Sequence, residues 1–295
     1  MKNSGMQYGK ASVHRVIDID PAAMPLSLIF PGMSFGTLNA TAIAALDGTH
    51  INVANGTVDI AIQSHLVRFG GKTILIDACI GEHKQRPMRP HWHQRSNTPY
   101  LANLAACGCT PDDIDIVMCT HLHADHVGWN TKLVDGRWVP TFPNARYLMT
   151  QAEIDQREAE IAKNPAANHG SYQDSVLPVI EHGRATIIKN GDAIIEGATI
   201  LPLPGHSPGQ VGLEIASGDG PNLLFLGDAI HSPVQVYKPD WFSAFCTDGA
   251  LAVETRKALL ARALAEDLIL IPAHLRAAHM RIREQNGALV PVYDV

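Results

Sequence analysis

Three histidines and one aspartate fall within six residues of this chain, in the motif His-x-His-x-Asp-His at 121–126. The apolar run 114–119 directly precedes the motif and has the length of a buried strand. Side chains at such strand ends converge on a shared crevice in α/β proteins. Imidazole and carboxylate are ligands that Zn²⁺ binds at about 2.0–2.2 Å. The pattern predicts a metal site rather than a polar loop whose histidines only face water.

Three later segments repeat this arrangement, because each is an apolar run that ends in one metal-binding residue. The segments are 199–206, 222–228 and 268–274, and they end in His206, Asp228 and His274. The order and spacing of these residues resemble the metallo-β-lactamase superfamily. The resemblance extends from Asp77 to the last histidine and covers most of the chain, apart from about the first fifty residues.

The resemblance implies two divalent metal ions. One ion would bind His121, His123 and His206, the second would bind Asp125, His126 and His274, and Asp228 would bridge both. An i, i+2 histidine pair on an extended segment projects to one side, which is consistent with this division. Zinc is favoured over manganese or iron at such nitrogen and oxygen donors, although the supply of metal often decides.

Asp77 occupies the position where the family carries an aspartate beside a metal-bound imidazole. Such a carboxylate holds the imidazole in one tautomer by accepting its free N–H. An aspartate that caps the following turn is the alternative interpretation.

The expected chemistry is hydrolysis by a hydroxide that bridges the two metals, because metal binding lowers the pKa of water from 15.7 to about 7. Asp125, in place of a cysteine ligand, resembles the dinuclear esterase, lactonase and phosphotriesterase branches, and its second oxygen could orient the hydroxide. The chain length and the run 227–231 further resemble N-acyl homoserine lactone lactonases and methyl parathion hydrolases. The resemblance therefore implies a lactonase or esterase of the quorum-quenching type.

His231 follows the bridging aspartate by three residues, where several lactonases carry a tyrosine that assists at the substrate oxygen. We predict that it faces the substrate and donates a proton, as an imidazole of ordinary pKa can. A loop imidazole satisfied by the backbone is the alternative.

Three other functions stay open. The first is an organophosphate triesterase on the same scaffold. The second is a mononuclear iron sulfur dioxygenase, which would not use His126 or His274 as ligands. The third is a non-catalytic metal-binding sensor, which the complete set of seven ligands disfavours.

The elements that position these residues follow an α/β pattern. Two strand-rich halves, each with helices, indicate two facing sheets with helices outside, and the resemblance implies the αββα sandwich. We expect one domain over residues 1–295. We expect residues 1–50 to form an irregular segment, because three prolines and two glycines lie among residues 21–36.

Turn and cap residues mark the other elements. Hairpin turns are predicted at Gly70–Gly71, Asn190–Gly191 and 217–220. Helices are predicted from Thr98–Pro99 to Gly108, from a Thr150–Glu153 capping box to about Lys163, and from Asp248 to about Ala265. Residues 82–97 and 164–182 read as irregular loops, with His91, Trp92, His93 and Tyr172 as candidate substrate contacts.

Composition narrows the partners and the compartment. The net charge of −6 and the lack of a basic run argue against nucleic acid. No apolar stretch of about eighteen residues and no signal-like start occur, so no membrane span is expected. Five cysteines without a framework spacing predict reduced thiols in a cytoplasmic protein. We expect a small-molecule substrate and leave a homodimer open.

Overall fold

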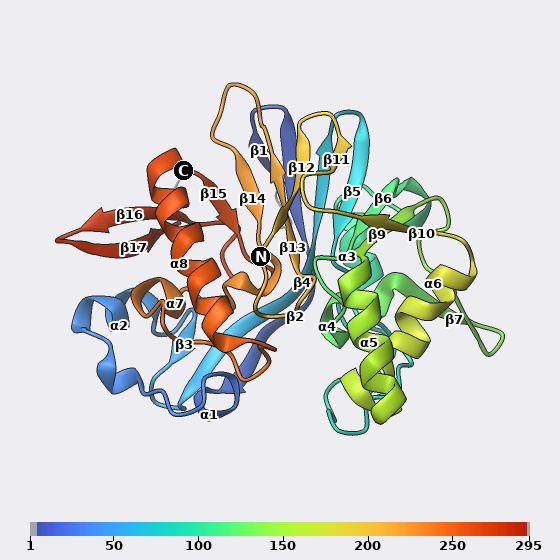
Figure 1. Cartoon of the computed structure of the whole chain (residues 1–295), viewed down its shortest axis with the longest axis horizontal. Helices are drawn as coiled ribbons and strands as arrows, with labels where there is room; N and C mark the ends of the chain where they lie inside the picture. The colour runs from blue at the N-terminus through green and yellow to red at the C-terminus, as the bar shows by residue number, and fades with distance from the viewer. Residues whose placement is uncertain (1–4, 294–295) are drawn as a thin grey trace.

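The computed structural model describes residues 5–293, and its centre is a pair of β-sheets packed face to face with helices on their outer sides (Figure 1). One sheet has eight strands and the other has five. Helix α8 lies on the outer side of the smaller sheet, while α3, α5 and α6 lie beside the larger one. This is the α/β sandwich that the sequence predicts.

The larger sheet runs in the order β1-β2-β4-β5-β6-β9-β10, with β3 beside β4. Its strands are β1 (Met6–Tyr8), β2 (Ala11–Pro25), β3 (Ile51–Asn52), β4 (Thr57–Phe69), β5 (Lys72–Ile76), β6 (Ile116–Met118), β9 (Arg146–Thr150) and β10 (Ala185–Ile188). The smaller sheet comprises β11 (Ala193–Ile195), β12 (Ala198–Pro202), β13 (Val211–Ile215), β14 (Leu223–Phe225) and β15 (Ile269–Ile271).

Eight α-helices and two separate hairpins complete the described chain. The helices are α1 (Leu26–Ile29), α2 (Ala40–Leu46), α3 (Tyr100–Ala106), α4 (Ala124–Val127), α5 (Gln151–Lys163), α6 (Leu177–Glu181), α7 (Val234–Tyr237) and α8 (Gly249–Glu266). The hairpins are β7 (Thr131–Val134) with β8 (Arg137–Pro140), and β16 (Arg281–Gln285) with β17 (Ala288–Val292).

Aliphatic side chains from both sheets fill the space between them. Ile74 and Ile116 of the larger sheet and Leu213, Phe225 and Ile271 of the smaller sheet belong to one buried cluster. These residues come from short, nearly continuous apolar strands, as expected for strands covered on both faces. The packing fixes how the ends of the two sheets meet.

The strand ends that carry chemistry all point the same way. In the larger sheet β5 and β6 are parallel, and in the smaller sheet β14 and β15 are parallel. Strand β12 runs in the same direction as β14, because both are antiparallel to β13. The segments after these five strands are therefore delivered to one edge of the sandwich.

The prediction of an irregular segment over residues 1–50 is wrong for residues 5–50, while residues 1–4 lie outside the described part of the chain. Strand β2 spans fifteen residues and pairs with β4 from Ser12 to Pro25, while α2 begins after an Asn39 cap. The ladder shifts register between Ile19 and Ala22, and Pro21 lies within that shift. A proline lacks the N–H that a regular ladder needs, so an irregularity in the pairing accommodates it.

Two of the three predicted hairpin turns are confirmed. Gly70–Gly71 joins β4 to β5, and residues 217–220 join β13 to β14. The prediction of a hairpin at Asn190–Gly191 is wrong, because β10 pairs with β9 in one sheet and β11 pairs with β12 in the other. That turn carries the chain between the sheets.

The three predicted helices are found at the expected positions, but not all of the predicted capping residues are correct. The Asp248 side chain accepts a hydrogen bond from the Leu251 N–H at 3.0 Å, as predicted. The first predicted helix starts at Tyr100, with Pro99 rather than Thr98 at its cap. Residues 82–97 contain no helix or strand, whereas 164–182 include α6.

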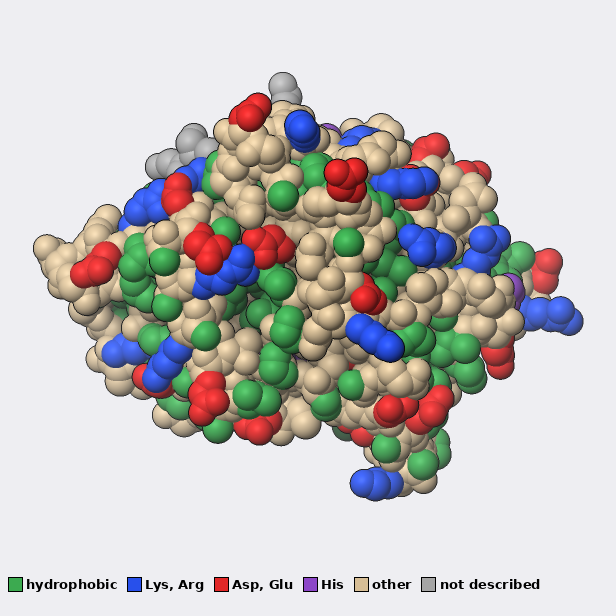
Figure 2. Space-filling model, turned by 45° about the horizontal axis from the view of Figure 1, so that its top comes forward, with side chains coloured by type: hydrophobic (Ala, Val, Ile, Leu, Met, Phe, Trp, Pro, Cys, Tyr) green, Lys and Arg blue, Asp and Glu red, His purple; other side chains and the backbone are tan. Residues whose placement is uncertain are grey.

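The surface bears no continuous basic area on the face drawn in Figure 2, where acidic and basic side chains are interspersed. Among residues 5–293, no helix has both the length and the apolar character needed to cross a membrane.

Candidate metal centre

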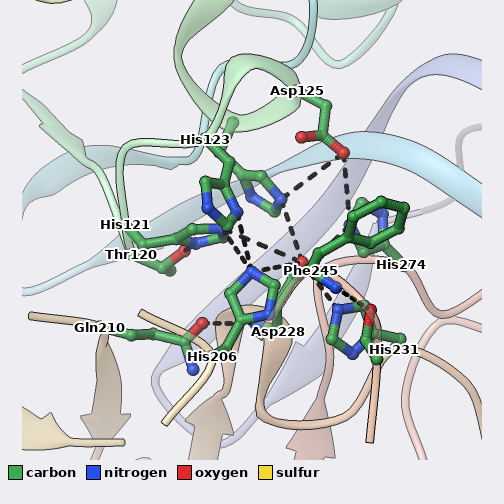
Figure 3. A network of polar contacts seen from close by, with 12 residues as sticks. Thr120, His121, His123, Asp125, His206, Gln210, Asp228, His231, Phe245 and His274 are labelled. Atoms are coloured by element: carbon green, nitrogen blue, oxygen red, sulfur yellow. Dashed lines mark hydrogen bonds and ion pairs between the residues drawn. The ribbon is translucent and has the colours of Figure 1, made fainter. Parts of the chain in front are cut away.

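The seven side chains that the resemblance assigns as ligands converge at this edge of the sandwich (Figure 3). Their donor atoms form overlapping groups in which all atoms lie within 4.8 Å of one another. The groups are His121–His123–His206, His121–His126–Asp228, Asp125–His126–His274 and His206–Asp228–His231. Residues from four separate segments thus meet in one cluster.

The first group brings three imidazole nitrogens together. His121 Nε2 lies 3.0 Å from His123 Nδ1, and His206 Nε2 lies 3.2 and 2.9 Å from these two atoms. Burial lowers the pKa of all three imidazoles, to about 3 for His123, where the charge of Arg157 contributes further. The rings are therefore neutral at pH 7, which is the form that binds metal.

The second group has its tautomers fixed by acceptors behind the rings. His274 Nδ1 lies 2.8 Å from the carbonyl oxygen of Ala61, which can only accept, so this nitrogen carries the proton. The remaining lone pair on Nε2 then points toward Asp228 Oδ1 at 3.2 Å and Asp125 Oδ2 at 3.7 Å. A lone pair facing two carboxylates is repulsive unless a cation or a proton lies between them.

Asp77 fixes the other histidine of this group. Its Oδ2 lies 3.0 Å from His126 Nδ1, while its Oδ1 accepts the Thr120 N–H at 2.8 Å. Asp77 thus contacts a cluster imidazole, as the resemblance implies, and its remaining contacts are to Thr120 of the motif loop rather than to the turn that follows Asp77 in the chain. Because Nδ1 is engaged by Asp77, His126 Nε2 faces Asp228 Oδ2 at 3.5 Å and has no hydrogen-bond partner.

Asp228 lies at the centre of the cluster. Its carboxylate oxygens lie within 3.9 Å of nitrogens of His121, His126, His206, His231 and His274. Burial by itself would raise the pKa of Asp228, but the facing imidazoles hold it well below its usual range. The Gln210 side chain accepts the Asp228 N–H at 3.2 Å and fixes the backbone.

This donor set fits two divalent cations. The buried His126 Nε2 and Asp228 Oδ1 lack hydrogen-bond partners, although unpartnered buried polar atoms are rare. Burial lowers the pKa of His126 and His274, yet the nearby carboxylates outweigh it and raise both. The carboxylates thus favour positive charge at these imidazoles, which a divalent cation would supply. Imidazole and carboxylate together are zinc-type ligands.

Glu153 is a positioning residue that the sequence did not reveal. The predicted capping box is wrong, because the Thr150 hydroxyl donates to the Gly209 carbonyl at 2.9 Å. The buried Glu153 carboxylate instead accepts the Leu122 N–H at 2.9 Å and the Gly209 N–H at 3.0 Å. One carboxylate thereby ties the loop of the 121–126 motif to the loop that bears His206.

His231 lies beside the cluster, as its position after Asp228 predicts. Its Nε2 is 3.3 Å from Asp228 Oδ2, and neither ring nitrogen has a hydrogen-bond partner. Burial lowers its pKa to about 4, so the ring is neutral at pH 7 instead of titrating near its ordinary value. It offers one N–H donor and one lone pair.

A cavity of about 860 Å³ opens over the cluster. Its wall includes His123, Asp125, His206, Asp228, His231 and His274. Of the four candidate contacts from the irregular loops, His91 and Trp92 line the cavity. His93 and Tyr172 do not: the His93 ring accepts the Arg86 N–H, and the buried Tyr172 hydroxyl donates to Glu158.

Residues 59–274 match the metallo-beta-lactamase superfamily, and the chain belongs to that superfamily. The match contains every member of the histidine and aspartate cluster.

Relatives with an assigned activity are distant. N-acyl homoserine lactonase AiiB of Agrobacterium fabrum is 24% identical over 210 residues, which are 63% of this chain and 69% of that protein. N-acyl homoserine lactonase AiiA of Bacillus thuringiensis subsp. kurstaki is 27% identical over 157 residues, which are 53% and 54% of the two chains. A ribonuclease of Thermus thermophilus is 23% identical over 173 residues, 58% of this chain and only 35% of the ribonuclease.

Solved structures agree over almost the whole chain. The hydrolase AbOPH of the beta-lactamase superfamily aligns with a TM-score of 0.78 at 23% identity, covering 99% of this chain and 97% of that one. The dizinc quorum-quenching lactonase AidC aligns with a TM-score of 0.76 at 19% identity and the same coverage. At these identities the likeness establishes the fold.

The two hydrogen bonds of Glu153 predict its effect on metal affinity. In Glu153→Gln the side chain keeps its shape, but its amide NH₂ must face one of the two backbone N–H donors. We expect the affinity for zinc to fall roughly 10–100-fold, as for other groups that orient metal ligands. Zinc titration against a competing chelator measures this affinity. Asp155→Asn, an exposed change on the same helix, is the control, and equal affinities in the two variants would contradict the role.

Proposed function

We propose that this protein is a metal-dependent hydrolase that opens a lactone or cleaves an ester with two divalent metal ions, of which zinc is favoured. The observation that carries the proposal is the pair of ligand groups joined through Asp228 at the floor of a large cavity. The relatives named N-acyl homoserine lactonases support a lactone or a similar carbonyl compound as the substrate.

His121, His123 and His206 would hold one ion, Asp125, His126 and His274 the other, and Asp228 would contact both. Ions bound there lower the pKa of a coordinated water to about 7 and polarise a substrate carbonyl. Asp125 lines the cavity and is positioned to orient the attacking water by accepting one of its hydrogens. Asp77 and the Ala61 carbonyl keep the lone pairs of His126 and His274 directed at the metals.

His231 is assigned to the leaving oxygen. It lines the cavity next to Asp228, and neither of its ring nitrogens has a hydrogen-bond partner. Since the ring is neutral at pH 7, its N–H serves as a hydrogen-bond donor to the departing alkoxide. This role differs from a protonated imidazole acting as a strong acid, which the sequence alone suggested.

Particular observations bear on each of the three alternatives. In a mononuclear iron sulfur dioxygenase His126 and His274 would have no metal, yet both are buried with their Nε2 atoms directed at Asp228. An organophosphate triesterase fits the roomy cavity and the histidine at position 231. A sensor without catalysis would not need His231 beside the metals.

A substrate panel tests the proposal. The zinc-loaded protein is assayed with homoserine lactones, aryl and alkyl esters, a phosphotriester and a β-lactam, and oxygen uptake is recorded with persulfides. We expect turnover of lactones or esters that is lost with a chelator. Turnover of the phosphotriester alone, or oxygen uptake alone, would replace the proposal with the corresponding alternative.

His231→Ala distinguishes a hydrogen-bond donor from a packing residue. An alkoxide leaving group gains from an N–H donor, whereas a nitrophenolate hardly needs one. We expect kcat/KM for an alkyl ester or lactone to fall roughly 10–100-fold more than kcat/KM for a nitrophenyl ester with the same acyl group. His231→Tyr, which restores a donor, should recover part of the loss. If His231→Ala lowers kcat/KM by the same factor for both substrates, His231 has only a packing role.

A further inference from the structure

Arg89 is a cation of the cavity wall that has no anionic partner. Its guanidinium carbon lies 5.5 Å from the ring centroid of Trp92 and 5.7 Å from that of Phe245. Both rings also line the cavity. Among residues 5–293, the Arg89 side chain makes neither an ion pair nor a hydrogen bond. Two aromatic faces therefore hold the guanidinium by cation–π contact and leave its N–H donors available.

The other charged groups of the wall do not neutralise Arg89. Among the described residues, the carboxylates that line the cavity are Asp125 and Asp228, and both belong to the histidine and aspartate cluster. Arg157 is the other arginine of the wall, and its charge is already paired with Glu160 at 3.0 Å. Metal ions would add further positive charge at the floor. An anionic group entering this cavity therefore meets an unpaired cation.

The loop that carries Arg89 is firmly anchored, so the position of the cation is preorganised. The fully buried Arg86 forms two hydrogen bonds to the Asp174 carboxylate, at 2.6 and 2.8 Å. Arg95 forms a similar pair with Asp18, at 2.7 and 2.8 Å. The Arg89 carbonyl itself accepts the Trp92 N–H at 2.8 Å and closes the turn. Such anchoring reduces the ordering cost of binding.

Much of the remaining lining of the cavity is aliphatic. It is built by residues of β2, α1 and β4, namely Ile19, Ala22, Met24, Leu28, Ile60 and Ile62. A ligand that satisfies both the aliphatic lining and Arg89 has an apolar body and one anionic group. A guanidinium can bind a carboxylate through two parallel hydrogen bonds, which makes a carboxylate a suitable anionic group for this position.

We propose that Arg89 is a specificity-determining residue that binds an ionised carboxylate carried by the substrate in addition to its scissile ester or lactone. The proposal rests on the proposed hydrolase function, because it names the class of compound that the same cavity accepts. The substrate class is thus an apolar ester or lactone with a free acid group, rather than a neutral one.

The test compares two esters that differ in one charge, 4-nitrophenyl hydrogen adipate and its methyl ester. In the zinc-loaded wild type we expect the acid to be preferred in kcat/KM. Arg89→Met should lower the ratio of acid to methyl ester roughly 10–100-fold, mainly through KM, since a hydrogen bond to a charged group is lost. Arg89→Lys should restore part of the ratio. Arg137→Met, which removes a charge from an exposed site on β8, should leave the ratio unchanged.

Calorimetric titration with hexane-1-sulfonate separates this inference from the hydrolase function, because it needs no turnover. We expect the zinc-loaded wild type and Arg137→Met to bind this anion with the same Kd, and Arg89→Met to bind at least tenfold more weakly. Equal binding by Arg89→Met and wild type, or an ester ratio that Arg89→Met does not change, would overturn the assignment. If no ester or lactone is hydrolysed while Arg89-dependent binding persists, the hydrolase proposal fails and the anion site stands.

Discussion

The structure depends on the meeting of imidazole lone pairs and carboxylates, which repel one another unless positive charge lies between them. Five imidazoles surround the buried Asp228 carboxylate within 3.9 Å, and several of their lone pairs face the same space as its oxygens. Packing of the two sheets forces this meeting, because five strands deliver their ends to one edge. Divalent metals convert the arrangement from a cost in stability into a stable centre, so metal binding and correct folding are coupled.

The surroundings of the cluster serve that same constraint. Asp77 and the Ala61 carbonyl bind the outer nitrogens of His126 and His274, so that the other ring nitrogens are directed into the cluster. Glu153 holds the loop of the 121–126 motif. The cavity over the cluster is lined both by aliphatic side chains and by the cation of Arg89. Metal ligands determine which reaction is feasible, and the walls determine which substrate reaches the metals.

The sequence predicts the cluster well because each member directly follows a short apolar strand, a purely local signal. The prediction for residues 1–50 fails because proline usually breaks a strand, whereas Pro21 lies within a register shift of β2.

The capping box predicted for Glu153 fails because it is a local pattern, and the contacts of Glu153 to Leu122 and Gly209 exist only in the folded chain. The Asn190–Gly191 turn fails for a similar reason, since turn chemistry does not specify which sheet the next strand joins. Arg89 carries no signal in the sequence, because its role depends on Phe245, far along the chain.

The central claim is that Asp228 joins two metal sites, and metal stoichiometry tests it most directly. The protein is saturated with zinc, freed of loosely bound metal by gel filtration and analysed for zinc per chain, beside Asp228→Asn. The account predicts two ions per wild-type chain and fewer than two in the variant, with weakened affinity for the ion that remains, since both sites lose the shared carboxylate. One ion per chain in the fully active wild type, or two tightly held ions in Asp228→Asn, would contradict it.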